Sequence, residues 1–297
     1  MDKDTISNWF KNLQSDITSN LEKIDGSGIF SGDTWKRSEG GGGHSMVIEN
    51  GDVFEKGGVN WSAVHGNTPQ KILDALKLEA ANFFATGVSI VIHPHSPHVP
   101  IIHMNVRYFE MSNGVWWFGG GIDLTPIYVN DDDAAHFHRK LKETCDRHNV
   151  DCYPQYKKWA DDYFFIKHRN ETRGIGGIFF DRLSSKHGTK KELFSFVQNV
   201  GNTFIPVYKE IVYKNKDLIF DDNQKKWQYL RRGRYVEFNL VLDKGTKFGL
   251  DTDGRTESIL MSLPPQANWA YNYKPETGSP EWDTLQKLKK GMDWVNK

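Results

Sequence analysis

The residues best suited to chemistry lie within residues 87–126, a stretch that otherwise has the pattern of β-strands. Strand side chains alternate between two faces, so His103, Asn105 and Arg107 share one face and the apolar residues between them share the other. An ordinary half-buried strand carries Lys, Thr or Glu on its solvent-facing side. An imidazole, an amide and a guanidinium in these positions instead predict a site for an anionic ligand.

The charged candidates of the chain each have more than one interpretation. Arg107 either pairs with a buried carboxylate or binds a carboxylate of a ligand through two parallel hydrogen bonds. Asp123, which follows three glycines, either belongs to the same site or forms a turn through its side chain. Arg255, which follows Asp253 and Gly254, fits an exposed turn slightly better than a site. These patterns predict a site for a polyanionic small molecule and specify no reaction.

Histidines offer a second kind of chemistry, the binding of a divalent metal. His93 and His103 share strand faces with other polar residues, whereas His138 and His168 lie on apolar stripes of expected helices. For each helix histidine, a buried neutral imidazole with a hydrogen-bond partner is the simpler explanation. Together the four could coordinate a metal, but their spacing matches no local metal motif such as HExxH.

Composition excludes several classes of protein. The 297 residues carry 38 basic and 38 acidic side chains, so the net charge of zero argues against a nucleic-acid-binding surface. No apolar run is long enough for a transmembrane segment, and the opening MDKDTISNWFKNL resembles neither a secretory signal nor a mitochondrial transit peptide. Cys145 and Cys152 lack zinc-site spacing and favour a reducing compartment. We expect a cytoplasmic protein.

Apolar periodicity predicts one α+β domain, residues 1–297, with an antiparallel sheet covered by helices. Short links between the strands predicted around residues 87–121 favour a meander over βαβ units. An exposed edge of the predicted strand 235–242 is the first place to look for a subunit interface. The main helices are expected at residues 3–24, 68–85, 131–145, 155–168, 190–213 (broken at Pro206) and from Pro280 onward.

Eight long segments follow one another in the order and spacing of one enzyme family: TWKRSEGGGGHSMV, FEKGGVNWSAVHG, HPHSPHVPIIHMNVRYFE, WWFGGGIDLTP, HFHRKLKETCDRH, YPQYKKWADDYFFIKHRNETRGIGGIFFD, RRGRYVEFNLV and GRTESILMSLPP. They resemble the oxygen-dependent coproporphyrinogen-III oxidases, and the resemblance covers residues 34–269. It implies a homodimer in which helices cover both faces of a large antiparallel sheet. It also implies oxidative decarboxylation of two propionates of coproporphyrinogen III to vinyl groups, which gives protoporphyrinogen IX in haem biosynthesis. Dioxygen is then the acceptor, CO2 and hydrogen peroxide are released, and no organic cofactor is used.

The resemblance also assigns site residues. His103 matches the proposed proton donor, Arg107 and Arg255 suit the carboxylates of the macrocycle, and Asp123 suits its pyrrole N–H groups. Matching substrate-binding positions are Ser89, Asn105, Val106, Arg107, Asp253, Gly254 and Arg255.

Two alternatives follow for a metal. Residues that match His93, His103, His138 and His168 are assigned as ligands in bacterial relatives, whereas eukaryotic relatives are described as metal-free. The strand pattern favours only His93 and His103 in the cleft.

Two departures from the family pattern concern substrate positioning. His95 and Ser96 stand where relatives commonly carry Arg-Asn, and Asp253 stands where relatives have a small residue. The runner-up function is a tetrapyrrole-binding or carrier protein without catalysis, and a histidine-rich metallohydrolase is a third option that lacks an obvious general base.

Overall fold

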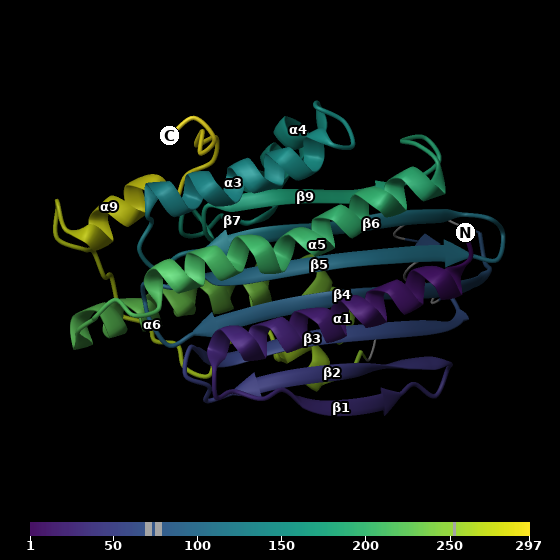
Figure 1. Cartoon of the computed structure of the whole chain (residues 1–297), viewed down its shortest axis with the longest axis horizontal. Coiled ribbons are helices and arrows are strands. Elements are labelled where there is room, and N and C mark those ends of the chain that lie inside the picture. Colours follow the sequence, from purple (N-terminus) through teal and green to yellow (C-terminus); the bar gives the residue numbers. More distant parts are fainter. Residues whose placement is uncertain (69–72, 75–78, 252–253) are drawn as a thin grey trace.

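The computed structural model of the chain describes residues 1–68, 73–74, 79–251 and 254–297. Its centre is a seven-stranded antiparallel sheet in the order β1-β2-β3-β4-β5-β6-β9, so the first six strands are neighbours both in sequence and in space (Figure 1). The predicted α+β class and the meander are confirmed. The strands are β1 (Ser31–Lys36), β2 (Gly41–Glu49), β3 (Phe54–Asn67), β4 (Asn82–Pro94), β5 (Ile101–Met111), β6 (Trp116–Thr125) and β9 (Gly176–Leu183), and a separate two-stranded sheet joins β7 (Phe165–Ile166) to β8 (Glu171–Thr172).

Helices come before and after the sheet strands in the sequence, and they pack on the faces of the sheet. Their ends carry the expected signals: Asp2 accepts a hydrogen bond from Thr5 N at the first helix, and Ser279 with Pro280 begins the last one. They are α1 (Lys3–Asp25), α3 (Asp131–Asp146), α4 (Cys152–Tyr163), α5 (Lys190–Asn215), α6 (Asp222–Glu237), the π-helix η1 (Phe238–Leu242), α7 (Lys244–Asp251), α8 (Thr256–Leu260) and α9 (Pro280–Lys287).

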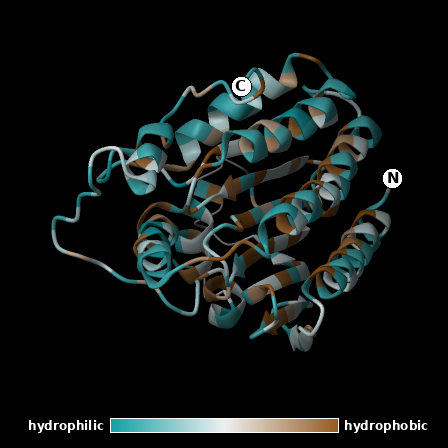
Figure 2. Cartoon of the chain, turned by 60° about the vertical axis from the view of Figure 1, so that its left-hand side comes forward, coloured by the Kyte–Doolittle hydropathy of each residue, from teal (hydrophilic) through white to brown (hydrophobic). Residues whose placement is uncertain are grey.

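One face of the sheet carries the main apolar core. Val88, Ile90 and Ile92 of β4 point toward α1 and α5, which lie across the front of the sheet in Figure 1. In Figure 2 the helices turn hydrophilic residues outward and hydrophobic ones toward the strands. Each large apolar side chain buried here stabilises the fold by roughly 1.5–3 kcal/mol. This face therefore contributes stability and leaves the opposite face available for polar groups.

The opposite face is covered by α6 and α8. Trp227 and Tyr235 of α6 pack on Val91 and Ile101 of the sheet. Close to α8, the side chain of Met261 packs directly over Gly58, so a larger residue at this position would displace that side chain. Helices thus cover both faces, as predicted.

Four predictions of secondary structure were wrong, in whole or in part, and one of them is the helix expected at residues 155–168, which spans Cys152–Tyr163. Residues 82–85, expected in a helix, form the start of β4 because they pair with both β3 and β5. A helix at residues 68–85 would bury Ile72, Leu76, Ala80 and Phe83, but Ala80 is exposed and Phe83 is a strand residue, whereas Ile72 and Leu76 lie outside the described residues. Pro206 does not break α5, since the long buried face of this helix outweighs one lost backbone hydrogen bond.

The predicted strand 235–242 is the end of α6 followed by η1. The same apolar pattern also fits a helix, because Tyr235, Phe238 and Asn239 are all buried at helical spacing. No strand edge exists at this segment, and the edges of the seven-stranded sheet are β1 and β9. The suggested subunit interface at this edge is therefore withdrawn.

Candidate active site

Three side chains form a continuous chain of hydrogen bonds on the face covered by α6. His103 of β5 and Asp123 of β6 are cross-strand partners, and His103 Nδ1 lies 2.8 Å from Asp123 Oδ1. Arg173, which follows β8, donates from Nη2 to both oxygens of Asp123 at 2.8 and 2.7 Å. Its Nη1 donates to Asn239 Oδ1 at 2.9 Å, so η1 also orients this arginine.

The opposite charges of Asp123 and Arg173 stabilise each other in this buried group of hydrogen-bonded side chains. Burial alone would raise the pKa of Asp123, but the Arg173 guanidinium and the hydrogen bond with His103 hold it below its usual value. The guanidinium of Arg173 also lies 4.4–4.7 Å from the ring centroids of Phe164, Tyr235 and Phe238. Asp123 is therefore an ionised acceptor, so the His103 Nδ1–H donates to it and Nε2 is left for other partners.

Two hydrogen-bond partners hold Arg107 beside His103 and Asp123. Its Nη1 donates to Asn105 Oδ1 at 2.7 Å, and its Nη2 donates to Asp181 Oδ1 of β9 at 2.8 Å. Gly119 of β6 provides the space, because a Cβ there would lie 2.5 Å from Asp181 Oδ1 and 2.9 Å from Arg107 Nη2. The guanidinium remains partly exposed and keeps free N–H groups.

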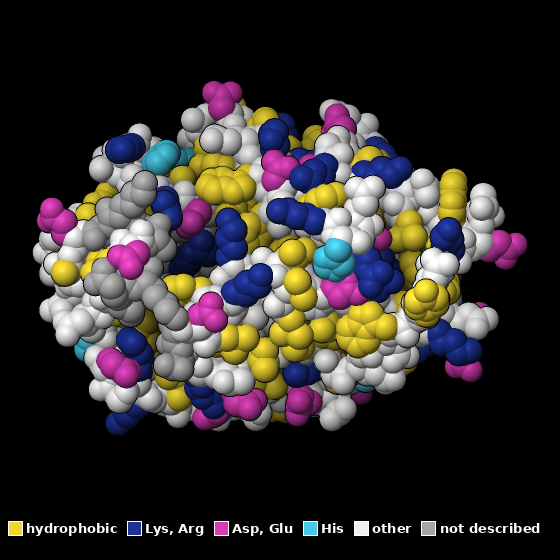
Figure 3. Space-filling view, turned by 180° about the vertical axis from the view of Figure 1, so that it is seen from behind, with side chains coloured by type: hydrophobic (Ala, Val, Ile, Leu, Met, Phe, Trp, Pro, Cys, Tyr) yellow, Lys and Arg dark blue, Asp and Glu magenta, His cyan; other side chains and the backbone are white. Residues whose placement is uncertain are grey.

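A row of polar side chains crosses the same face at right angles to the strands. Asp33, Ser45, Asn60, Ser89 and Asn105 are successive cross-strand partners from β1 to β5. At about 4.8 Å per strand the row spans roughly 19 Å. The surface seen from behind is hollowed, and Lys and Arg side chains gather in and beside the hollow (Figure 3).

Arg255 lies at the far end of this row. Its Nη1 donates to Ser258 Oγ at 3.0 Å and to Ser45 Oγ at 3.3 Å, and its Nη2 pairs with Asp33. The start of α8 is further attached to β3, since Asn60 Nδ2 donates to Ser258 O at 2.8 Å. Arg255 thus contacts the polar face from the start of α8.

The four histidines proposed as metal ligands are not brought together. His93 is buried and hydrogen-bonded to Ser262 O at 2.8 Å, and burial followed by the positive charge of Arg232 lowers its pKa to about 3. His138 is buried among α3, α4 and the C-terminal segment, where it contacts Tyr153 Oη at 2.9 Å and Ile175 O at 3.0 Å. Burial also lowers the pKa of His138 to about 3.

His168 was predicted on a buried helix stripe, but α4 ends at Tyr163 and His168 is partly exposed. Its Nε2 lies 2.8 Å from Glu237 Oε2. In the described part of the chain, no group of three or more His, Cys, Asp or Glu side chains could hold a metal ion. The four-histidine set does not fit a common metal.

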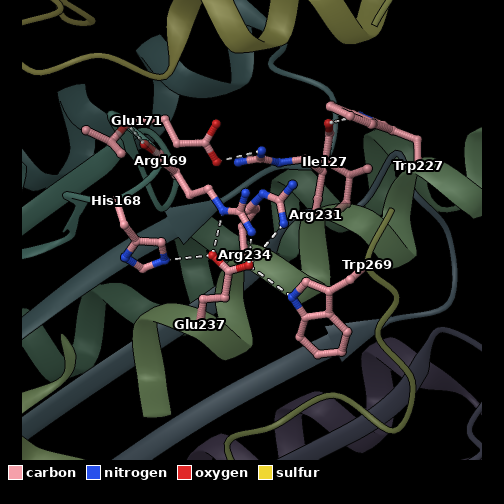
Figure 4. A network of polar contacts seen from close by, with 11 residues as sticks. Ile127, His168, Arg169, Glu171, Trp227, Arg231, Arg234, Glu237 and Trp269 are labelled. Atoms are coloured by element: carbon pink, nitrogen blue, oxygen red, sulfur yellow. Dashed lines mark hydrogen bonds and ion pairs between the residues drawn. The ribbon is translucent and has the colours of Figure 1, made fainter. Parts of the chain in front are cut away.

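The three arginines of α6 each have a carboxylate partner. Arg231 pairs with Glu171 at 2.7 Å, Arg232 with Glu55 at 2.5 Å, and Arg234 with Glu237 at 3.1 Å. Figure 4 shows Glu237 surrounded by Arg169, Arg234, His168 and Trp269. Partial burial would raise the pKa of Glu237, but these donors lower it to about 2. Each arginine of α6 thus neutralises a carboxylate beside it.

A hollow of about 610 Å³ lies between α4 and the C-terminal residues, and none of the candidate site residues named above lines it. Its lysines pair with aspartates, as Lys157 does with Asp161 at 2.6 Å.

Among the described residues, no helix combines the length and apolar character that a bilayer crossing needs.

Comparison with known proteins assigns the family. The family model described as coproporphyrinogen III oxidase matches residues 5–294. This chain belongs to the coproporphyrinogen III oxidase family. It is 52% identical over 296 residues to the oxygen-dependent coproporphyrinogen-III oxidase, mitochondrial, of Homo sapiens, covering 95% of this chain and 65% of the relative. The corresponding proteins of Rattus norvegicus and Drosophila melanogaster are 51% and 50% identical, with 95% of this chain and 67% and 76% of the relatives covered. The chain thus spans about two thirds of the length of the human relative.

Within this family framework, the structure places most of the expected residues on one face. Ser89, Asn105 and Arg107 lie on the polar row or directly beside it, whereas Val106 points into the apolar core with its side chain buried. Gly254 precedes Arg255 at the entry to α8, and Asp253 lies outside the described residues. Of the two interpretations of Asp123, the turn is wrong, because Asp123 lies within β6 with its side chain buried against His103 and Arg173.

Sequence reasoning missed Arg173, Asp181 and Asp33. A carboxylate inside a buried strand requires a cationic partner, and that requirement could have directed attention to Arg173 in front of the glycine-rich strand. Asp181 lies within the same glycine-rich strand, β9, and no local pattern marks it as a partner of Arg107. Asp33 was not considered because β1, an exposed edge strand, was not predicted.

Proposed function

We propose that this chain catalyses the oxygen-dependent oxidative decarboxylation of two propionates of coproporphyrinogen III, which yields protoporphyrinogen IX. The observation that carries the proposal is the polar face, where one arginine lies at each end of a row that includes Ser89 and Asn105. The hydrogen-bonded pair of His103 and Asp123 adjoins this row. A tetracarboxylate macrocycle requires such cationic groups, and its chemistry requires a positioned proton carrier.

Each decarboxylation converts one propionate side chain into a vinyl group. The carboxylate leaves as CO2, and the methylene next to the ring loses one proton and two electrons. Dioxygen takes up two electrons and two protons to become hydrogen peroxide, so each step consumes one proton overall. Dioxygen is the co-substrate of the proposed reaction, and no step is assigned to an organic cofactor or to a metal.

We assign the proton transfer to His103. Asp123 accepts its Nδ1–H and fixes the tautomer, so the Nε2 atom can take up and return a proton. The negative charge of Asp123 stabilises the imidazolium that forms, and Arg173 holds the carboxylate in place. Asp123 acts through His103 in this proposal, since its side chain is buried and both of its oxygens already accept hydrogen bonds from Arg173.

Arg107 and Arg255 are the proposed partners of substrate carboxylates, and Ser89 and Asn105 are the proposed neutral contacts between them. Val106 contributes through its backbone, because its side chain points into the core. Gly254 and Asp253 complete the set as residues next to Arg255.

A direct assay tests the function. The pure protein is incubated with coproporphyrinogen III in air and under argon, and protoporphyrinogen IX is measured after oxidation by fluorescence. Formation of the product in air alone supports the proposal. Tight binding of the substrate without product in air would favour a tetrapyrrole carrier instead.

The homodimer and the cytoplasmic location are also proposals. The human and rat relatives carry mitochondrial names, so location requires fractionation of cells that express this chain. Light scattering of the purified chain at several concentrations tests the dimer.

A further inference from the structure

We propose that Asp33 and Asp181 are exchangeable partners of the two substrate-binding arginines, and that carboxylates of the substrate replace them on binding. This inference rests on the proposed function. It assigns a role in ligand binding to two residues on opposite edges of the sheet, since Asp33 belongs to β1 and Asp181 to β9.

Both arginines of the polar face already hold a carboxylate of the chain. Arg107 donates to Asp181, and Arg255 pairs with Asp33. Each arginine also has neutral partners, which are Asn105 Oδ1 for Arg107 and the hydroxyls of Ser258 and Ser45 for Arg255. The neutral partners can keep the guanidinium in place while the carboxylate partner changes.

Exposure separates these two pairs from the third pair of the site. Arg107 and Asp181 are 38% and 30% exposed, and Arg255 and Asp33 are 27% and 59% exposed. Arg173 and Asp123 are only 2% and 1% exposed. An exposed ion pair contributes little free energy because water replaces the lost contact, whereas opening a buried pair leaves uncompensated charges. Opening either of the two partly exposed outer pairs therefore costs less free energy than opening the buried inner pair.

A carboxylate of the ligand offers an arginine the same hydrogen-bond geometry as an aspartate. Binding then exchanges one carboxylate for another, and the released aspartate regains water. In the unliganded protein, Asp33 and Asp181 keep the arginines extended over the polar row. They also weaken binding, since the ligand has to compete with them.

Asparagine substitutions test the exchange. Asp33→Asn and Asp181→Asn keep a side-chain oxygen that can accept from the arginine but remove the competing charge. The probe is coproporphyrin III, the fully oxidised macrocycle with the same four carboxylates, and its Kd is measured by quenching of tryptophan fluorescence. Each substitution should lower Kd roughly two- to fivefold, the worth of an exposed ion pair. An unchanged or higher Kd would overturn the proposal, because an aspartate that only attaches α8 or orients Arg107 would weaken binding when removed.

Two controls separate exchange from other effects. Asp16→Asn removes an exposed charge from α1 on the other face of the sheet, and it should leave Kd unchanged. An equal gain in affinity with this variant would attribute the effect to net charge and contradict exchange. In an Arg107→Gln background, Asp181→Asn should no longer improve binding, and a persisting improvement would also contradict it.

The arginine variants distinguish this inference from the proposed function. If Arg107→Gln and Arg255→Gln both leave Kd unchanged, the site itself is misassigned and both proposals fail. If they weaken binding while the asparagine variants fail to strengthen it, only the exchange is wrong.

Discussion

His103 and Asp123 face each other across β5 and β6, and His103 Nδ1 lies 2.8 Å from Asp123 Oδ1. Because the two residues are cross-strand partners, the register of the sheet sets their separation. Arg173 holds the other side of the carboxylate, so the imidazole can present only its Nε2 atom to a ligand.

Replacing the imidazole should abolish most of the turnover without unfolding the protein. We expect His103→Ala to lower kcat roughly 10²- to 10⁴-fold, the usual contribution of a general acid or base. The measurement is steady-state product formation, with circular dichroism as the check on folding. His65→Ala, at an exposed position of β3, is the matched control and should retain activity. Near-normal turnover of the His103 variant would remove this residue from the mechanism.

Removing Arg173 should destabilise the fold through Asp123. We expect Arg173→Met to lower the free energy of unfolding by roughly 3–5 kcal/mol, because a buried carboxylate is left uncompensated. Urea midpoints provide the measurement. The double variant Arg173→Met with Asp123→Asn should recover part of the loss, and no recovery would show that the charge of Asp123 is not the cause.

The ion pair of Arg173 and Asp123 should also make stability depend on pH. In the native protein the pKa of Asp123 is below its unfolded value, so its contribution is present above about pH 4 and is lost as pH falls through the native pKa. In Arg173→Met, burial should instead raise the pKa of Asp123, and the destabilisation should shrink on acidification. Urea midpoints of the two proteins should therefore converge toward low pH.

Glu237 should contribute to stability in a way that acid removes. Its pKa is lowered to about 2 from 4.5, so the contribution is complete above about pH 4.5 and disappears as pH falls toward 2. We expect Glu237→Gln to lose roughly 1–3 kcal/mol at neutral pH, allowing for partial exposure of the side chain. Glu276→Gln, at an exposed position, should have no such effect on the urea midpoint. A loss that persists unchanged at about pH 2 would contradict this origin.

His138 should act as a core residue. We expect His138→Phe to destabilise the fold by roughly 1–3 kcal/mol, since Tyr153 and Ile175 each lose a hydrogen-bond partner. The pKa of His138 is about 3, so its contribution is complete above the unfolded value of about 6.5 and falls with acidification. The variant should lose this part of the acid sensitivity. Metal content measured by elemental analysis should equal that of the native protein, and a lower content would make His138 a ligand.

Gly119 should be required for the position of Arg107. An alanine Cβ there would lie within 3 Å of both Arg107 and Asp181, so the pair would have to move. We expect Gly119→Ala to raise KM roughly ten- to hundredfold, the worth of one charge-assisted hydrogen bond. Steady-state kinetics provide the measurement. A normal KM would mean that Arg107 does not bind the substrate in this position.

Some of the fold and site followed from local sequence alone. The alternation of residues 101–111 was sufficient to place His103, Asn105 and Arg107 on one face, because successive strand side chains point in opposite directions. The apolar stripes of α1 and α3 were likewise sufficient for helices. The segment 235–242 was misread because an apolar pattern this short fits either a strand or a helix, and only packing against Arg173 and the sheet selects the helix.

The sequence by itself determined the polar face of β5, the α+β class and the family. Only the tertiary structure decided which charges meet. Asp123 is joined to Arg173, and Arg107 and Arg255 are joined to Asp181 and Asp33 from the two edges of the sheet. Such pairs depend on the order and register of the strands. Strand order and register are in turn set by contacts between residues that lie far apart in the sequence. Local periodicity reports the direction of a side chain and carries no information about the partner that it reaches.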